Sequence, residues 1–133
     1  MTDSESQLDS ATRQAVLRHL RTIEEFEILL LLARDTSRYW SPAAAGADLG
    51  VSEDSARTAL DALASRNLLD VRIGESVLYR LDPTSSATTR AVERIIVAAR
   101  TQRTAVLRAI ATAGRAVGDF ADAFRISKRR RDG

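Results

Sequence analysis

The hydrophobic pattern of the chain changes from a helical period to an alternating one near residue 69. Residues 43–49 and 53–65 carry apolar side chains at helical spacing, whereas 69–73 and 77–81 alternate apolar and polar side chains as strands do. A three-residue turn that contains glycine separates the two alternating runs. The pattern therefore predicts a short helix, a second helix and a two-stranded hairpin, in that order.

The boundaries of the two helices are marked by residues with known end preferences. Ser41 is a good N-cap, and Pro42 follows at the first helical position, where its missing N–H costs nothing. Gly50 is suited to end the short helix, and Ser52 caps the next one. These residues predict a tight turn of only a few residues between the helices.

Two further helices are predicted before this turn. The first begins near Leu8, where apolar residues recur at helical spacing. Thr22 and Glu25 have the spacing of a capping box, so a new helix starts there or the earlier one bends. Residues 28–32 are all apolar, which is too many for a helix with one buried face. At least two layers must cover them: the domain core, and a terminal helix of this chain or of a partner.

This order of elements resembles the winged helix-turn-helix regulators of bacteria, of the MarR-like kind. The residues that carry the resemblance are Ser41–Ser52, Ala59–Leu69 and the strand pair. The segment 119–125, Asp-Phe-Ala-Asp-Ala-Phe-Arg, is similar to uncharacterised members of that group. The resemblance implies a mainly α fold with a small β-hairpin wing. It divides the chain into residues 1–21 (leader and helix), 22–83 (winged domain) and 84–133 (amphipathic helix and basic tail).

The resemblance also implies a way of binding DNA. The helix that follows Ser52 would enter the major groove, and the hairpin would touch the DNA backbone or the minor groove. The candidate contacts are the exposed polar residues of these two elements: Ser52, Ser55, Arg57, Thr58, Ser65 and Arg66 on the helix, with Arg72 and Arg80 on the wing.

The charges on this predicted helix oppose DNA binding. Arg57 is its one central cation, and Asp54 and Asp61 lie at spacings that allow each to pair with it. An arginine that is already paired is less available to a phosphate, and affinity for duplex DNA comes largely from neutralised phosphates. Two interpretations of Arg57 stay open: a DNA contact, or a surface ion pair worth at most about 1 kcal/mol.

The C-terminal third carries an apolar heptad seam with one flaw, Arg103. We expect one helix from about Thr88 to about Ala113, ~39 Å long at about 1.5 Å per residue. Such a helix would pair two copies of the chain, or fold back onto residues 28–32 of its own chain. The residues predicted to form the dimer seam are Val92, Ile96, Ala99, Val106, Ile110 and Ala113.

The net charge of +2 hides a division along the chain. Residues 1–85 hold 14 Asp/Glu and 9 Lys/Arg, whereas residues 86–133 hold 4 Asp/Glu and 11 Lys/Arg. The basic end, Lys128, Arg129, Arg130 and Arg131, has three open interpretations: a sequence-independent phosphate contact, a disordered solubilising end, or a segment that docks on the acidic half.

Other function classes find little support in the sequence. No cysteine is present, no apolar run is long enough to span a membrane, and the polar N-terminus is not a signal peptide, so we expect a cytoplasmic location. His19 is the single histidine, and no catalytic, phosphate-loop or metal motif is found. We expect no enzyme, no cofactor and no metal. A ligand-gated sensor with a small-molecule effector is a third interpretation, although no sequence feature indicates its pocket.

The sequence thus predicts a homodimeric regulator of transcription that binds double-stranded DNA. The alternative is a winged-helix protein-interaction module with little or no DNA binding, because the predicted winged half is acidic. The sequence identifies neither a DNA site nor activation versus repression.

Overall fold

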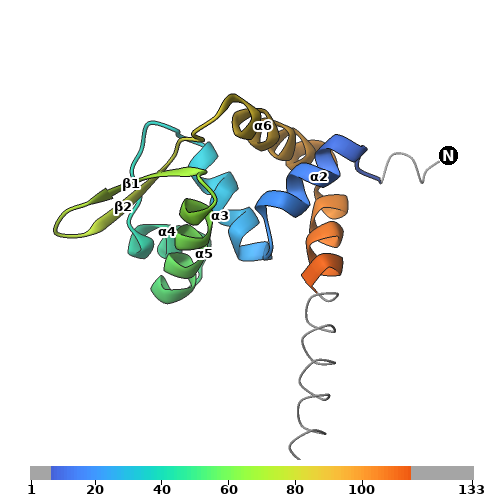
Figure 1. Cartoon of the computed structure of the whole chain (residues 1–133). Helices are drawn as coiled ribbons and strands as arrows, with labels where there is room; N and C mark the ends of the chain where they lie inside the picture. Colours follow the sequence, from blue (N-terminus) through green and yellow to red (C-terminus); the bar gives the residue numbers. More distant parts are fainter. Residues whose placement is uncertain (1–6, 115–133) are drawn as a thin grey trace, which may run out of the picture.

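The computed structural model describes residues 7–114, which are mainly helical with one two-stranded antiparallel β-hairpin (Figure 1). This arrangement is consistent with a winged-helix-like layout, and the order of elements agrees with the order predicted from the hydrophobic pattern. Within the described part of the chain, no helix has both the length and the apolarity to cross a membrane. In chain order the elements are α2 (Ser10–His19), α3 (Ile23–Ala33), α4 (Pro42–Leu49), α5 (Glu53–Ser65), β1 (Leu69–Ile73), β2 (Val77–Leu81) and α6 (Ser86–Thr101), and residues 103–114 are also helical.

The predicted capping residues begin the helices of the central unit. The side chains of Thr22, Ser41 and Ser52 each accept a hydrogen bond from a backbone N–H in the first turn of α3, α4 and α5. Gly50 ends α4 in the left-handed region, with φ of 74°. Because these bonds satisfy N–H groups that a helix leaves unpaired, they fix where each helix starts.

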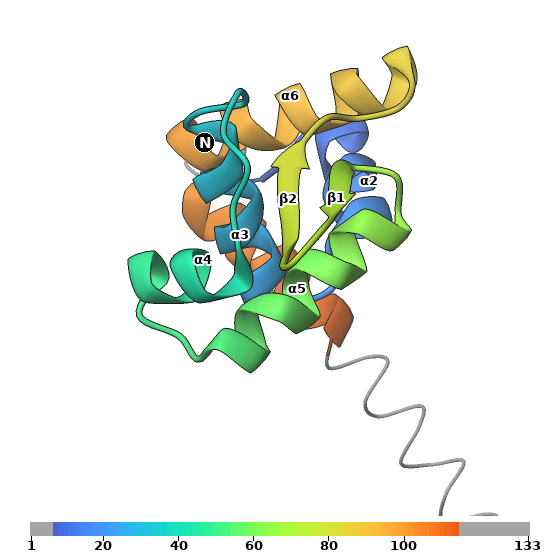
Figure 2. The same ribbon diagram turned by 90° about the vertical axis from the view of Figure 1, so that its left-hand side faces the viewer.

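The hairpin is tied to the loop before α4. β1 and β2 pair from Leu69–Leu81 to Ile73–Val77. Trp40 joins the outer edge of β2 as an isolated bridge. Its N–H donates to the carbonyl of Tyr79 at 2.7 Å, and its carbonyl accepts from the N–H of Tyr79 at 2.8 Å. Figure 2 shows the hairpin standing beside α5 and α4. The residue that precedes α4 therefore holds the hairpin next to the helix pair.

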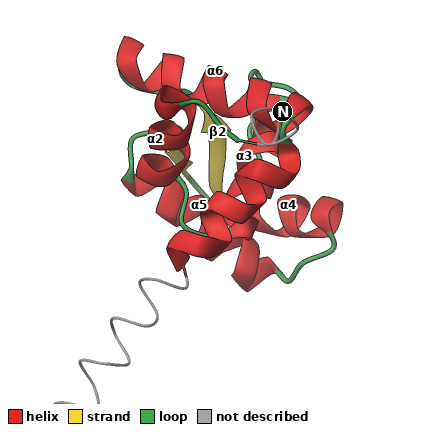
Figure 3. Cartoon of the chain, turned by 90° about the vertical axis from the view of Figure 1, so that its right-hand side faces the viewer, coloured by secondary structure: helices red, strands yellow, loops and turns green. Residues whose placement is uncertain are grey.

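Helix α3 lies at the centre of the core. Phe26, Ile28, Leu29, Leu31 and Leu32 are each at most 1% exposed. One layer over them comes from α4, α5 and β2. The other comes from the terminal helices of the same chain, which share one apolar cluster with α3 (Figure 3). The two layers predicted for residues 28–32 are thus confirmed, and the second layer is intramolecular.

The prediction of one continuous helix to Ala113 is wrong. Helix α6 ends at Thr101, and Gln102 leaves the helical region with φ of −143° and ψ of 44°. The chain is helical again from residue 103 and runs off in a new direction (Figure 1). The bend lets both segments cover the same core, because Ile95 and Ala98 before it and Ala109 after it are all buried.

Three of the residues predicted to form a dimer seam therefore have a different role. Val92, Val106 and Ile110 are 4%, 0% and 2% exposed within a single chain. Ile96 and Ala99 are half-buried against the same core, and Ala113 is half-buried as well. A heptad pattern records only which side chains are apolar at regular spacing, and here the chain itself covers Val92, Val106 and Ile110. The predicted dimer role is corrected for these three residues, and it stays a prediction for Ile96, Ala99 and Ala113.

Candidate nucleic-acid interface

The direction of α5 is set by a close approach between α4 and the turn that follows it. A Cβ atom placed on Gly46 would lie 2.8 Å from the carbonyl oxygen of Val51. The same two residues are joined by a hydrogen bond from the N–H of Val51 to the carbonyl of Gly46, at 2.9 Å. The sequence analysis did not identify this role of Gly46. The glycine stands within an alanine-rich helix, and the local pattern does not indicate a close approach to Val51. Without a side chain at this position, α5 can turn back close against α4.

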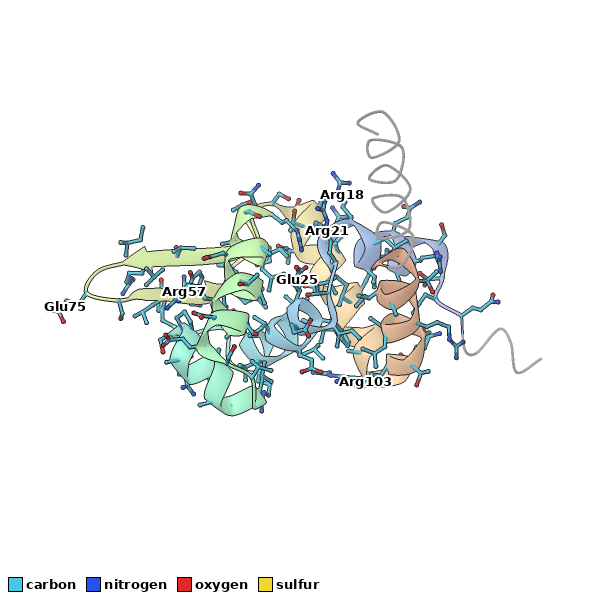
Figure 4. The ribbon with its side chains drawn as sticks, turned by 90° about the horizontal axis from the view of Figure 1, so that it is seen from below. Arg18, Arg21, Glu25, Arg57, Glu75 and Arg103 are labelled. Atoms are coloured by element: carbon cyan, nitrogen blue, oxygen red, sulfur yellow. The ribbon has the colours of Figure 1, made fainter. Side chains whose placement is uncertain are left out.

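Helix α5 separates an inward apolar face from an outward polar face. The inward face is buried and consists of Ala56, Ala59, Leu60 and Leu63. Of the predicted DNA contacts, Ser52, Ser55, Arg57, Thr58 and Ser65 are exposed. Figure 4 shows Arg57 on α5 beside the hairpin. The structure thus brings together an outward helix face and a hairpin on one side of the molecule.

The hydroxyl groups on this face already have partners. The Ser52 hydroxyl donates to the hydroxyl oxygen of Ser55 at 2.9 Å. Those of Thr58 and Ser65 donate to backbone carbonyls of the turn before them, at 2.9 Å and 2.7 Å. A phosphate needs a donor, so each hydroxyl must rotate away from its present acceptor before it can contact one.

Arg57 is held by carboxylates of its own helix. Its guanidinium lies 3.2 Å from Asp54 and 3.4 Å from Glu53. The predicted pairing with Asp54 is confirmed, but the predicted pairing with Asp61 is wrong. The Asp61 carboxylate instead accepts a hydrogen bond from the Tyr79 hydroxyl at 2.5 Å. Burial, followed by this hydrogen bond, raises the pKa of Tyr79 to about 12, so the tyrosine remains a neutral donor.

Arg66 points into the molecule rather than outward. Its guanidinium lies 2.5 Å from the Glu25 carboxylate and donates to the carbonyl of His19 at 2.7 Å. Glu25 also accepts from the N–H of Arg21 at 2.9 Å, and not from the N–H of Thr22 as a capping box would require. Arg66 therefore ties the end of α5 to the α2–α3 connection, and this use of its guanidinium removes it from the outward face.

The hairpin predicted to be a wing offers one cation without a carboxylate partner in the described chain. Arg72 is exposed, and its guanidinium lies 4.4 Å from the centre of the Tyr39 ring. Arg80 packs on the same ring but also lies 3.4 Å from Asp70 and 3.5 Å from Asp82. The Tyr39 hydroxyl donates to Asp70. Tyr39 thus positions both wing arginines, and only Arg72 is left to face a polyanion.

Sequence reasoning did not single out a second cation on this side, Arg38. Its guanidinium lies 3.5 Å from the centre of the Trp40 ring, and it has no ion pair within residues 7–114. The position of Arg38 directly before the aromatic pair Tyr39-Trp40 was the sequence feature that could have indicated it. The predicted contacts Lys128–Arg131 lie outside the described residues.

The charge of the described chain is divided between two parts. Residues 22–83 hold 11 Asp/Glu and 6 Lys/Arg. Residues 7–21 and 84–114 together hold 8 Lys/Arg and 2 Asp/Glu. These two segments form α2, α6 and the last described helical turns, which pack together. Residues 22–83 are therefore the acidic part of the described chain, and the terminal helices form the basic part.

Comparison with known proteins finds neither a matching family nor a similar curated sequence. No cluster of three or more His, Cys, Asp or Glu side chains suited to a metal ion occurs among the residues that the structure describes.

Proposed function

We propose that the protein is a winged helix-turn-helix regulator that binds double-stranded DNA, with α5 as its recognition helix. The observation that carries the proposal is the outward polar face of α5, which carries Arg57 and lies beside the hairpin (Figure 4). Arg72 is exposed on that hairpin. A helix presented in this way can enter the major groove, whereas the hairpin reaches the adjacent backbone. The resemblance of residues 41–81 to bacterial winged-helix regulators supports the same function.

Binding in this mode requires Arg57 to exchange partners. Its present carboxylate neighbours, Glu53 and Asp54, are both exposed, and exposed ion pairs contribute only about 0–1 kcal/mol. A DNA phosphate can therefore compete for the guanidinium, although the two carboxylates remain nearby and repel the DNA. The basic residues Lys128–Arg131 are proposed to add phosphate contacts that are independent of sequence.

The test is fluorescence anisotropy with labelled duplex DNA at several salt concentrations. The logarithm of the binding constant should fall with the logarithm of salt, with a slope of about −0.9 per phosphate contact. Arg57→Gln and Arg72→Gln should each weaken binding and reduce that slope by about one contact. Arg13→Gln is the matched control, because Arg13 is exposed and lies on α2 rather than on α5. Absence of binding at low salt refutes the proposal.

A protein-interaction module is the second candidate, and a specific observation favours it. Of the six arginines in residues 22–83, four lie within ion-pair distance of a carboxylate: Arg34, Arg57, Arg66 and Arg80. Replacing Asp54 with Lys distinguishes the two functions, because Asp54 has no role in the core and is 92% exposed in its side chain. If the parent lacks DNA affinity and Asp54→Lys creates it, the module is favoured; if Arg57→Gln abolishes an affinity that the parent has, the module fails.

The proposed regulator keeps the homodimer expected from the sequence, but not the whole seam. Val92, Val106 and Ile110 are covered by their own chain, so two copies must meet through other residues. A two-fold dimer would place two α5 helices on half-sites about one DNA turn apart, which suits a palindromic site. Sedimentation velocity of the full chain, with and without duplex DNA, measures the number of copies directly.

A further inference from the structure

A cleft of about 740 Å³ lies between α2, the turn that follows α5 and the first turns of α6. α2 and α6 contact each other here, and Asn67 and Thr84, which flank the open end of the hairpin, also line the cleft. Its size falls within the range of small-molecule sites, about 300–1,000 Å³. Neither the helix face of α5 nor the wing contributes to it, so it is separate from the proposed DNA surface.

The charged side chains that line the cleft are all basic. Arg18, Arg66, Arg90 and Arg94 border it, and no Asp or Glu is among its lining residues. Arg66 is the one that has a carboxylate partner in the described chain, whereas Arg18, Arg90 and Arg94 form no ion pair there. Four arginines with one paired carboxylate among them, Glu25, give the concave surface a net positive potential, which attracts anions.

A buried histidine in the wall of the cleft lacks a hydrogen-bond partner. His19 is 8% exposed, and its imidazole makes no hydrogen bond to any described residue. Burial, followed by the charges of Arg18 and Arg66, lowers its pKa, so the ring is neutral near pH 7 and offers one donor and one acceptor. Neither ring nitrogen is among the fully buried unpartnered atoms of the described residues, so the ring remains accessible from the cleft and can hydrogen-bond a group bound there.

The first turn of α6 also opens on the cleft. Ser85 caps this helix by accepting from the N–H of Thr88 at 3.1 Å, and both residues line the cleft. The turn contains no acidic side chain, and the helix is 16 residues long. The free N–H groups and the dipole of such a helix start favour an anion. They act on the same side of the cleft as Arg90 and Arg94.

We propose that this cleft binds a small organic phosphate ester. Arg18, Arg90, Arg94 and the start of α6 would hold the phosphate, and His19 would donate to it or to its ester oxygen. The cleft is far larger than a phosphate group alone, and its wall includes the methyl groups of Ala11, Ala15, Ala87 and Ala91. Gln14 and Asn67 supply hydrogen-bonding groups for a sugar or base. The proposal does not depend on DNA binding.

The test uses the full chain and the NMR signals of its single histidine. Inorganic phosphate, AMP and glucose 6-phosphate are titrated separately, with adenosine as the uncharged control. A bound phosphate dianion favours the protonated ring, so the pKa of His19 should rise in the complex. Calorimetry gives the affinity of each probe. Adenosine should cause no shift, because the proposed site recognises charge.

Substitutions in the cleft complete the test. Arg94→Gln and His19→Phe should each weaken the tightest phosphate probe by about tenfold or more, since the first removes a positive charge and the second removes the ring donor to the phosphate. Arg13→Gln on the same helix as His19 removes an equal charge outside the cleft and should leave the affinity unchanged. Thermal unfolding of each variant shows whether it is folded.

Three results would overturn the proposal. The first is the absence of any His19 shift with all three phosphate probes at millimolar concentration. The second is an equal loss of affinity in Arg13→Gln, which would indicate diffuse attraction rather than a site. The third is a His19 shift produced by duplex DNA and by no phosphate monoester, which would assign the cleft to the DNA backbone.

Discussion

The ion pair between Glu25 and Arg66 joins three elements through two side chains. Glu25 lies in the first turn of α3, Arg66 caps the end of α5, and Arg66 also donates to the carbonyl of His19, the last residue of α2. Their side chains are 7% and 18% exposed, so each charge depends on the other. Removing one partner leaves the remaining charge buried without compensation, which costs far more than loss of an exposed pair.

We therefore expect Arg66→Gln to lower the free energy of unfolding by about 3–5 kcal/mol. Arg34→Gln is the matched control, because its pair with Asp48 is largely exposed and should contribute less than about 1 kcal/mol. Urea unfolding followed by circular dichroism measures both. Equal effects in the two variants would show that Arg66 is no more buried in solution than Arg34.

Gly46 is required for a contact and not for flexibility. Gly46→Ala places a methyl group 2.8 Å from a backbone oxygen, so α4 or the turn must shift. We expect a loss of about 1–3 kcal/mol, the usual cost of overpacking. Gly74→Ala is the control, since the nearest atom to its Cβ would be 4.0 Å away. Thermal melts of both variants suffice, and a Gly46→Ala variant as stable as the parent would contradict the close approach.

Because the chain has a single histidine, the effect of its protonation on stability can be measured with one substitution. The pKa of His19 in the folded chain lies below its ordinary value of 6.5, so the unfolded chain binds a proton first as the pH falls. Its contribution to stability is therefore complete above 6.5 and is lost as the pH falls through the folded pKa. We expect the parent to lose more stability than His19→Gln between about pH 7.5 and pH 5.5. Parallel curves for the two proteins would contradict this.

At the scale of the elements, substitutions of Ser52 can distinguish its role as the N-cap of α5 from its predicted role as a DNA contact. Ser52→Ala removes the cap of α5 and should cost about 1 kcal/mol. Ser52→Asp keeps an N-cap acceptor and suits the positive start of the helix, so it should be as stable as the parent. Under the proposed function the added charge faces DNA, and Ser52→Asp should bind duplex DNA more weakly than Ser52→Ala. Anisotropy and urea unfolding of both variants measure the two effects separately.

Most elements could be predicted because their boundaries are local. Ser41, Gly50 and Ser52 act within a few residues of their own position, and the alternation of the two strands needs only one pleated surface. The bend at Gln102 could not be predicted, because the heptad pattern continues across it and the cause is the shape of the core that both segments cover. The same holds for Arg66, whose partner lies 41 residues away in the sequence.

At the scale of the whole molecule, packing and charge divide the chain differently. One apolar cluster runs from α2 through α3 and α5 to residue 110, so the described chain has a single core. Charge nevertheless separates residues 22–83, which are acidic, from the terminal helices, which are basic. The predicted winged surface was identified from local signals, whereas the basic cleft was not, because its arginines come from α2, α5 and α6 and meet only in the fold.

Ile110 distinguishes an intramolecular core from a dimer seam. Ile110 is 2% exposed within one chain, so Ile110→Ala should lower the free energy of unfolding by about 2–5 kcal/mol at any protein concentration. Val97 on α6 is 57% exposed, and Val97→Ala should change it by less than about 0.5 kcal/mol. A residue in a dimer seam would instead shift the association constant and make the unfolding temperature of the parent depend strongly on concentration. Unfolding of the parent and Ile110→Ala at several protein concentrations, combined with sedimentation velocity, distinguishes a core residue from a seam residue. Substitution of a core residue leaves the fraction of dimer among folded molecules unchanged.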